Sequence, residues 1–446
     1  MSLFGSLFSG VSGLNAQSRA MGMISDNVAN VNTTAYKGAE AQFANMVTRS
    51  RGSSTYSPGG VRVSSFSTVA SQGLIQSSTS STDAAISGAG FFVVSSLPDG
   101  AGERLYTRAG SFNPDSQGDL RTPSGYYLQG WSLDTNEAIA NLNRLETVNV
   151  HSINGLAAAT TRVEIGANLD ADQAVYTGAY APGDLTAYQT SGGASGVQPS
   201  FTRDIQVYDS LGRAHDLTLA FLHTGGADSW AVEVGGAVAD LDATTHPNGL
   251  LASGTVTFAG DGTLQSAVLT PLASGVPGSP VEAQWAAASG ADPSQLSFDF
   301  GTVGGVDGLS QFASPTSVAF VTQNGAEVGE LNAVRIDEQG YVIASFTNGQ
   351  DRRLYQLPIA TFANASGLDA RSGNVYAQTD TSGEYNLRIA GHGGAGVVAP
   401  SALEGANVDL AEEFTKMIVT QRAYSANAKI INTTDQMLEE LIRMTG

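Results

Sequence analysis

The side chains that could carry acid–base, nucleophilic or metal chemistry are few and scattered in this sequence. Cysteine is absent from all 446 residues, so no disulfide, thiolate nucleophile or cysteine metal site can form. No zinc-binding spacing such as H-E-x-x-H joins the five histidines, which are His151, His215, His223, His246 and His392. No G-x-S-x-G nucleophile elbow occurs either. We interpret His215 beside Asp216 as polar side chains at a strand edge. The sequence therefore predicts a protein that is not an enzyme and holds no metal or cofactor.

One glycine-rich segment, Gly391-His392-Gly393-Gly394-Ala395-Gly396, matches the G-x-G-x-x-G count of dinucleotide-binding loops. Pro400 follows four residues later, and no room remains for a βαβ unit with an acidic residue after it. We therefore interpret this segment as a connector between a β region and the last helix. Acidic turns such as Asp115 and Asp261-Gly262 lack the ligand spacing of a calcium loop and indicate ordinary β-turns.

The charge balance excludes two classes of partner. The formal net charge is −20, and Lys37, Lys416 and Lys429 are the only lysines, so we expect no nucleic-acid binding and no attraction to an anionic membrane. No basic residue precedes Arg19, and glycines and serines interrupt each apolar run near the start. This pattern is that of neither a cleaved signal peptide nor a membrane span. If the protein is exported, we expect it to leave the cell with its N-terminus intact.

The elements at the two ends of the chain are predicted to be helices with apolar side chains at heptad spacing. Such spacing places one narrow apolar stripe along a helix, which is the seam of a coiled coil. The predicted seam residues are Phe4, Leu7, Val11, Leu14, Met21 and Val28 at the start, and Phe414, Met417, Tyr424, Ala428, Ile431, Leu438 and Ile442 at the end. The seams could join different subunits, or they could form an ordinary helix pair within one chain.

The two predicted helices differ in intrinsic stability. The first contains Gly5, Gly10, Gly13 and Gly22, each costing about 1 kcal/mol relative to alanine, so we expect it to be marginal alone. The second is predicted to begin with Asp409 as N-cap. Small residues in the first helix would also allow a neighbouring backbone to approach closely.

Between the helices, short apolar runs with period-two alternation predict β structure. Residues 50–82 are interpreted as an extended linker, and a Gly/Ser/Pro-rich boundary is placed at 182–200. The alternation after this boundary predicts a sandwich or barrel. We therefore predict a multidomain α+β protein in which two mainly antiparallel all-β domains are nested between the ends of a coiled-coil-like axial core. The predicted parts are a helical core (1–75 and 402–446), an inner β domain (76–150 and 311–401) and an inserted outer β domain (151–310).

Several segments resemble the signatures of the bacterial flagellar rod and hook axial protein family. The segment after the first helix matches at Asn27, Asn30, Asn32, Thr33, Tyr36 and Lys37, and the C-terminal segment matches at Asn407, Asp409, Gln421, Arg422 and Tyr424. Residues 106–112, 125–131 and 362–368 resemble the family's shared β domain. Ala35 departs from the family pattern, which more often has glycine there, and a glycine would permit positive φ.

The middle of the chain resembles the hook branch of this family. Residues 204–212 and 215–219 are similar to its middle-domain motif and indicate a β-hairpin with Asp209 and Gly212 in the turn. The resemblance implies a self-assembling subunit of the flagellar hook, a flexible tube that joins rod to filament. It implies as partners other copies of the chain, the distal rod protein, the hook cap protein, the hook–filament junction protein and the flagellar type III export apparatus. The alternatives are a distal rod protein with an insertion or, from a different class, a secreted β-domain adhesin or glycan-active enzyme that carries helical ends.

Overall fold

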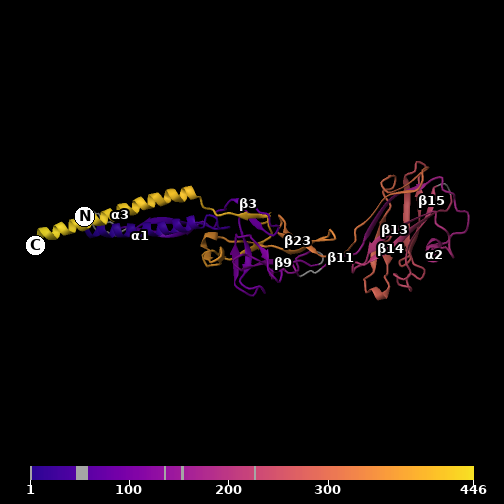
Figure 1. Cartoon of the computed structure of the whole chain (residues 1–446), viewed down its shortest axis with the longest axis horizontal. Coiled ribbons are helices and arrows are strands. Elements are labelled where there is room, and N and C mark those ends of the chain that lie inside the picture. Colours follow the sequence, from indigo (N-terminus) through magenta and orange to yellow (C-terminus); the bar gives the residue numbers. More distant parts are fainter. Residues whose placement is uncertain (1–2, 47–58, 135–136, 152–154, 226–227, 446) are drawn as a thin grey trace. The chain divides into compact units, whose positions relative to one another are not determined.

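The chain forms two compact units in a computed structural model that describes residues 3–46, 59–134, 137–151, 155–225 and 228–445 (Figure 1). Unit 1 comprises residues 1–152, 333–345 and 351–446, and unit 2 comprises 153–332 and 346–350. Long helices and mostly antiparallel sheets give the mixed fold that the sequence predicts. The finer division of unit 1 into a helical core and an inner β domain stays a prediction.

The two long helices of unit 1, α1 (Leu3–Ala29) and α3 (Leu410–Thr445), lie side by side (Figure 1). Asp409 caps α3, because its Oδ1 accepts hydrogen bonds from the backbone N–H groups of Ala411 at 2.7 Å and Glu412 at 3.2 Å. The predicted N-cap is therefore confirmed. No described helix has both the length and the apolarity needed to span a membrane.

Part of the predicted linker over 50–82 forms strands, at residues 61–67 and 75–77, so the prediction of a linker is wrong for these residues. Strand β2 (Val61–Ser67) pairs antiparallel with β1 (Ala39–Asn45), and β3 (Ile75–Ser77) pairs with β31 (Ala402–Glu404). Val63 is buried where the β1–β2 hairpin packs on α1. Serine-rich sequence can form such a hairpin because one buried face is sufficient to fix its register. Residues 50–58 of the predicted linker lie outside the described residues.

The main sheet of unit 1 has the strand order β23-β24-β25-β9-β5-β6-β28-β27. Every residue of its strand β5 is buried. Phe91 and Tyr106 pack with Tyr376 on one face of the sheet, and Phe92 packs edge-on against Phe112. The bounds along this order are β23 (Leu331–Ile336), β24 (Tyr341–Phe346), β25 (Asp351–Gln356), β9 (Tyr127–Ser132), β5 (Phe91–Ser95), β6 (Arg104–Thr107), β28 (Val375–Ala377) and β27 (Asp369–Arg371).

Shorter elements complete unit 1. They are β4 (Ala84–Ser87), β7 (Asn113–Pro114), β8 (Leu120–Arg121), β10 (Glu146–Thr147), β26 (Ile359–Thr361), η2 (Ala365–Gly367), β29 (Asn386–Arg388) and β30 (Val397–Pro400). The glycine-rich segment 391–396 is the turn between β29 and β30, with positive φ at Gly391, Gly393 and Gly394. It therefore connects two strands rather than a β region and a helix, and no helix follows it directly, as a dinucleotide-binding loop would require.

Unit 2 is a sandwich of two sheets that share one apolar core. The first sheet runs β13-β14-β15-β16-β17, and the second runs β18-β19-β12-β20 with β21 also on β12. Trp230 and Val232 of β15 are buried in the same core as Ile165 and Leu169 of β12. The first-sheet bounds are β13 (Phe201–Tyr208), β14 (Ala214–His223), β15 (Ser229–Gly236), β16 (Leu250–Phe258) and β17 (Leu264–Pro271).

The second sheet of unit 2 is mixed, because β12 pairs parallel with β19 and β20 and antiparallel with β21. These pairings carry unit 2 past residue 310, where the sequence places the end of the outer domain. The bounds are β12 (Arg162–Asp170), β18 (Val281–Ala283), β19 (Ser294–Asp299), β20 (Leu309–Phe312) and β21 (Ser317–Gln323), with β11 (Leu156–Ala158) paired to β22 (Ala326–Gly329) and a short η1 (Ala287–Ser289).

The hairpin between β13 and β14 confirms the predicted turn. Oδ1 of Asp209 accepts hydrogen bonds from the amides of Leu211 and Arg213, and Gly212 has a φ of 77°. His215 is buried, although β15 pairs with β14 only from Leu217 onward. Its ring stacks on Trp285 at 4.0 Å between centroids, and its Nε2 lies 3.2 Å from Oδ2 of Asp209.

The predicted boundary at 182–200 contains a helix, α2 (Asp184–Thr190), which the sequence interpretation missed. Leu185 is fully buried in a cluster with Ala220 and Leu222, and this cluster is separate from the sandwich core. The fully buried carboxylate of Glu233 accepts hydrogen bonds from the amides of Gly183 and Thr186 at the start of α2. These tertiary contacts hold a helix that Gly- and Thr-rich sequence does not predict.

Candidate functional site

The two ends of the chain meet at a polar junction centred on Asn27. Its Nδ2 donates to the carbonyl of Ala39 at 3.0 Å and to Oε2 of Glu413 at 3.2 Å. Its Oδ1 accepts from the Ala39 amide at 3.0 Å and from the Tyr36 hydroxyl at 3.2 Å. Asn27 is buried, so these partners replace the water that its amide would otherwise bind. This signature residue therefore fixes α1, β1 and α3 to one another.

A buried ionic cluster lies beside this junction. The Glu404 carboxylate contacts Nζ of Lys37, and its Oε2 lies 3.2 Å from Nη1 of Arg108. The amide of Gly73 donates to Glu404 Oε1 at 2.7 Å, and Lys37 Nζ also donates to the carbonyl of Ser71 at 2.6 Å. Burial lowers the pKa of Lys37, although its hydrogen bond to Glu404 opposes that shift. Two cations and one carboxylate are thus held away from water, and each depends on the others.

Asn407 connects the two ends at a second point. Its Oδ1 accepts from the Gly38 amide at 2.8 Å, while its Nδ2 donates to the carbonyl and hydroxyl of Thr68. Ala35, three residues before Gly38, is fully buried with a φ of 57°. The left-handed backbone that the family's glycine would suit is therefore present, and here an alanine adopts it. Its amide donates to the Glu404 carbonyl at 2.7 Å, which helps to hold that conformation.

The other signature residues have local or exposed positions. Nδ2 of Asn30 donates to the carbonyl of Asp26, and the Thr33 hydroxyl donates to Oδ1 of Asn30, which closes the turn after α1. Asn32 is exposed, as are three signature residues on α3, namely Gln421, Arg422 and Tyr424. The signature is therefore divided between residues that join the two ends and residues that face outward.

Within the chain, α1 packs on α3 and the β1–β2 hairpin through a face of mostly small residues that includes none of the predicted seam residues of α1, whereas on α3 the predicted seam residue Ile431 lies against this face. The buried positions on α1 are Gly10, Gly13, Ala16, Ala20, Ile24 and Asn27. A Cβ added at Gly10 would lie 3.0 Å from Cγ1 of Ile431, and one at Gly13 would lie 2.7 Å from Nδ2 of Asn427. These two glycines thus permit the close approach of α3. Their spacing with Ala16 and Ala20, in steps of three or four residues, is the sequence signal that could have identified this face.

The predicted seam residues divide into two groups. Five are exposed, namely Phe4, Val11, Phe414, Tyr424 and Ile442. Eight are partly buried, namely Leu7, Leu14, Met21, Val28, Met417, Ala428, Ile431 and Leu438. Further large apolar side chains are exposed on the same helices, among them Phe8, Ile418, Val419, Ile430 and Met437. The helix pair therefore leaves rows of apolar surface that a single chain does not cover, as an association surface would.

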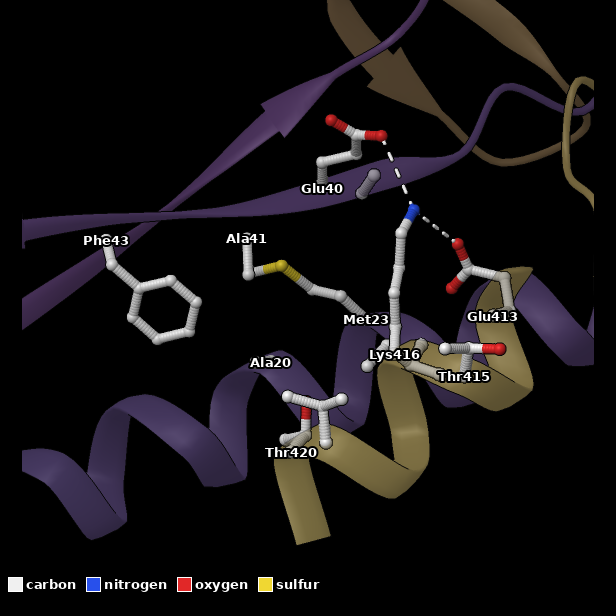
Figure 2. Close-up of a pocket in the computed structure, with 12 residues that line it drawn as sticks. Ala20, Met23, Glu40, Ala41, Phe43, Glu413, Thr415, Lys416 and Thr420 are labelled. Carbon is white, nitrogen blue, oxygen red and sulfur yellow. Dashed lines mark hydrogen bonds and ion pairs between the residues drawn. The ribbon is translucent and has the colours of Figure 1, made fainter. Parts of the chain in front are cut away.

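A groove of about 380 Å³ lies between α1, α3 and β1. Met23 and Ile24 contribute to it from α1, Phe43 from β1, and Val419 from α3. Figure 2 shows Lys416 at one end, between Glu40 and Glu413, with Phe43 farther along the groove.

The charges at the Lys416 end of the groove are mainly negative. Lys416 Nζ lies 2.9 Å from Glu413, 3.0 Å from Glu412 and 3.6 Å from Glu40. Burial opposes the charged form of Lys416, but Glu413 and Glu412 outweigh it and raise its pKa. One cation thus faces three carboxylates.

The histidines do not assemble into a site. His215, His223 and His246 are buried in unit 2, and His223 stacks on Trp230. Within the described part of the chain, no three His, Asp or Glu side chains lie close enough together to bind a metal ion.

Comparison with known proteins identifies related sequences along the chain. Four family profiles match it: "Flagella basal body rod protein" at residues 7–37, "Flagellar hook protein FlgE/F/G D1 domain" at 85–168, "Flagellar basal body protein FlaE D2 domain" at 196–326, and "Flagellar basal body rod FlgEFG protein C-terminal" at 399–444. The first and last cover the segments that meet at the Asn27 junction.

Curated relatives match over their whole length. The flagellar hook protein FlgE of Caulobacter vibrioides is 33% identical and that of Rhizobium meliloti 34% identical, each covering 100% of both chains. The crystal structure of the Helicobacter pylori flagellar hook protein FlgE2 aligns with 74% of this chain and 100% of its own, at 15% identity and a TM-score of 0.44.

Proposed function

Because the chain belongs to the flagellar hook protein family, we propose that α1 and α3 form the contacts by which its copies polymerise. The chain is a structural subunit of the bacterial flagellar hook, and a member of this family self-polymerises in the flagellum. The observation that supports the role of the helices is the row of exposed apolar side chains on them, including Phe4 and Val11 on α1 and Phe414 and Tyr424 on α3.

The dimensions and energetics of the helices fit this proposal. The 36 residues of α3 span about 54 Å at 1.5 Å per residue, which is long enough for contacts with several neighbouring copies. Covering one large apolar side chain contributes about 1.5–3 kcal/mol, so a few such contacts per copy would hold a polymer together. In this proposal the heptad positions form a coiled-coil-like core between subunits, while the small-residue face of α1 keeps α3 in place within each copy.

The specific partner proteins are proposed on the same family membership. We propose that the polymer joins the distal rod protein at one end and the hook–filament junction protein at the other, and that it grows beneath the hook cap protein. We further propose export by the flagellar type III apparatus without removal of an N-terminal signal.

The test introduces aspartate at two exposed positions of α3, one apolar and one polar. Phe414→Asp places a carboxylate in the proposed contact, and Thr433→Asp places one at an exposed polar position on the same helix. We expect Phe414→Asp to abolish sedimentable polymer while the monomer keeps its melting temperature, and we expect Thr433→Asp to polymerise. Normal tubes from Phe414→Asp in electron micrographs, or an equal loss of assembly in both variants, would refute the role of this surface.

A further inference from the structure

We propose that the groove between α1, α3 and β1 binds the start of α1, residues 3–11, from a second copy of this chain. The inference rests on the proposed polymer and adds which segment of one copy enters which site of the next. It is carried by three observations: the chemistry of the groove, the side chains that the start of α1 exposes, and the distance between the two within one chain.

The groove suits an apolar, uncharged occupant. Its walls include Ala20, Met23, Ile24, Ala41, Phe43 and Val419. A cavity of about 150 Å³ accepts a benzene molecule, so a volume of about 380 Å³ has room for two aromatic rings. The three carboxylates around Lys416 would repel an acidic segment.

The start of α1 has the matching chemistry. Phe4 is 74% exposed, Phe8 55% and Val11 50%. Their spacing of four and three residues places them on one face of the helix, which is the arrangement of helices that bind in apolar grooves. No charged side chain occurs before Arg19, so this segment meets no repulsion from the groove carboxylates.

The end of α3 is the other apolar helical segment, and its charges disfavour it. Met444 is 80% exposed there, but Asp435, Glu439 and Glu440 outnumber the single cation of this segment, Arg443. Placing those carboxylates near Glu40 and Glu412 would bring like charges together. Charge therefore selects the start of α1 as the occupant.

The occupant must come from another copy. The groove is lined by Met23 of the same helix that carries Phe4, and 19 residues of α-helix separate them by about 28 Å. Because α1 is one continuous helix, its start cannot fold back into the groove beside Met23. A second copy can provide that segment.

Cross-linking tests the contact directly, because the chain has no cysteine of its own. Purified Phe8→Cys and Val419→Cys chains are mixed, polymerised and oxidised, and the dimer band is measured by non-reducing electrophoresis. The matched control replaces Val419→Cys by Gln421→Cys, which is exposed on α3 about 200° around the helix. We expect at least about tenfold more mixed dimer with Val419→Cys than with Gln421→Cys. Equal yields, or a higher yield with Gln421→Cys, would overturn the proposal.

A second measurement keeps the proposal testable if the cysteine chains assemble poorly. We expect Val419→Glu to raise the protein concentration needed for polymerisation at least about tenfold, and Gln421→Glu to change it less than about twofold. Equal effects would overturn the groove contact, while polymers of the unmodified chain would still form. Failure of the unmodified chain to polymerise under any condition would count against the proposed function instead.

Discussion

Replacing Glu404 by glutamine should destabilise unit 1 strongly, because this carboxylate is the only acidic group that contacts Lys37 and Arg108 in their described buried cluster. Glutamine keeps the size of the side chain but removes its charge, so two cations remain buried without a counter-charge. Removing one partner of a buried ion pair costs about 3–5 kcal/mol. For a unit of this size, 1 kcal/mol corresponds to about 2–4 °C, which gives an expected loss of roughly 6–20 °C in melting temperature.

Differential scanning calorimetry of the full chain is the assay, with the transition of unit 2 as internal reference. Glu412→Gln is the matched control, because Glu412 pairs with Lys416 at 3.0 Å but its side chain is 64% exposed. An exposed pair of this kind contributes less than about 1 kcal/mol.

A double substitution tests the cause of the loss. Lys37→Met with Glu404→Gln removes one of the two uncompensated cations, so its cost should be smaller than the sum of the two single costs. Equal melting temperatures for Glu404→Gln and Glu412→Gln would refute the argument that the cluster stabilises unit 1 through charge.

Further predictions concern the two helical ends and unit 2. Gly22→Ala should stabilise α1 by up to about 1 kcal/mol, since an added Cβ has no neighbour within 4 Å. Gly13→Ala should give no such stabilisation, because its Cβ would clash with the side chain of Asn427. Calorimetry measures the difference between the two variants. Ala35→Gly should leave unit 1 stability within about 1 kcal/mol, while Ala35→Val, at a buried residue with positive φ, should cost about 3 kcal/mol or more in chemical denaturation; equal stabilities would count against strain at this position. Burial disfavours ionised Asp209, but hydrogen bonds from Arg213, His215 and Leu211 outweigh it and lower the pKa of Asp209. The stability that ionised Asp209 gives to unit 2 is therefore complete above about pH 4, the value of the unfolded chain, and is lost as the pH falls through the lower pKa of the folded state. The melting temperature of unit 2 should therefore fall less steeply with acid in Asp209→Asn than in the exposed control Asp216→Asn, and parallel curves would contradict this. Glu233→Ala should lower the free energy of unfolding of unit 2 by about 3 kcal/mol, because the buried start of α2 loses its hydrogen-bond acceptor. An unchanged free energy of unfolding would show that α2 does not depend on this carboxylate.

Local features of this protein were accessible from the sequence because their causes are local. Asp409 is the N-cap of α3, and the turn at Asp209 and Gly212 joins β13 to β14. Each depends on residues no more than four positions apart, where a side-chain carboxylate accepts hydrogen bonds from nearby backbone amides. The heptad periodicity likewise predicted helices at both ends, and the multiple signature segments indicated the hook family.

Only the tertiary structure decided which surfaces those helices cover. Periodicity shows that a helix has an apolar stripe but not which neighbour lies against it, and α1 uses Gly10, Gly13 and Ala16 within the chain while Phe4 and Val11 stay exposed. Glu404, which lies 367 positions from Lys37, could not be recognised as a buried counter-ion from spacing. The same holds for the burial of His215 and for α2. These features arise from contacts between distant segments, whose burial and charge compensation exist only once the chain has folded.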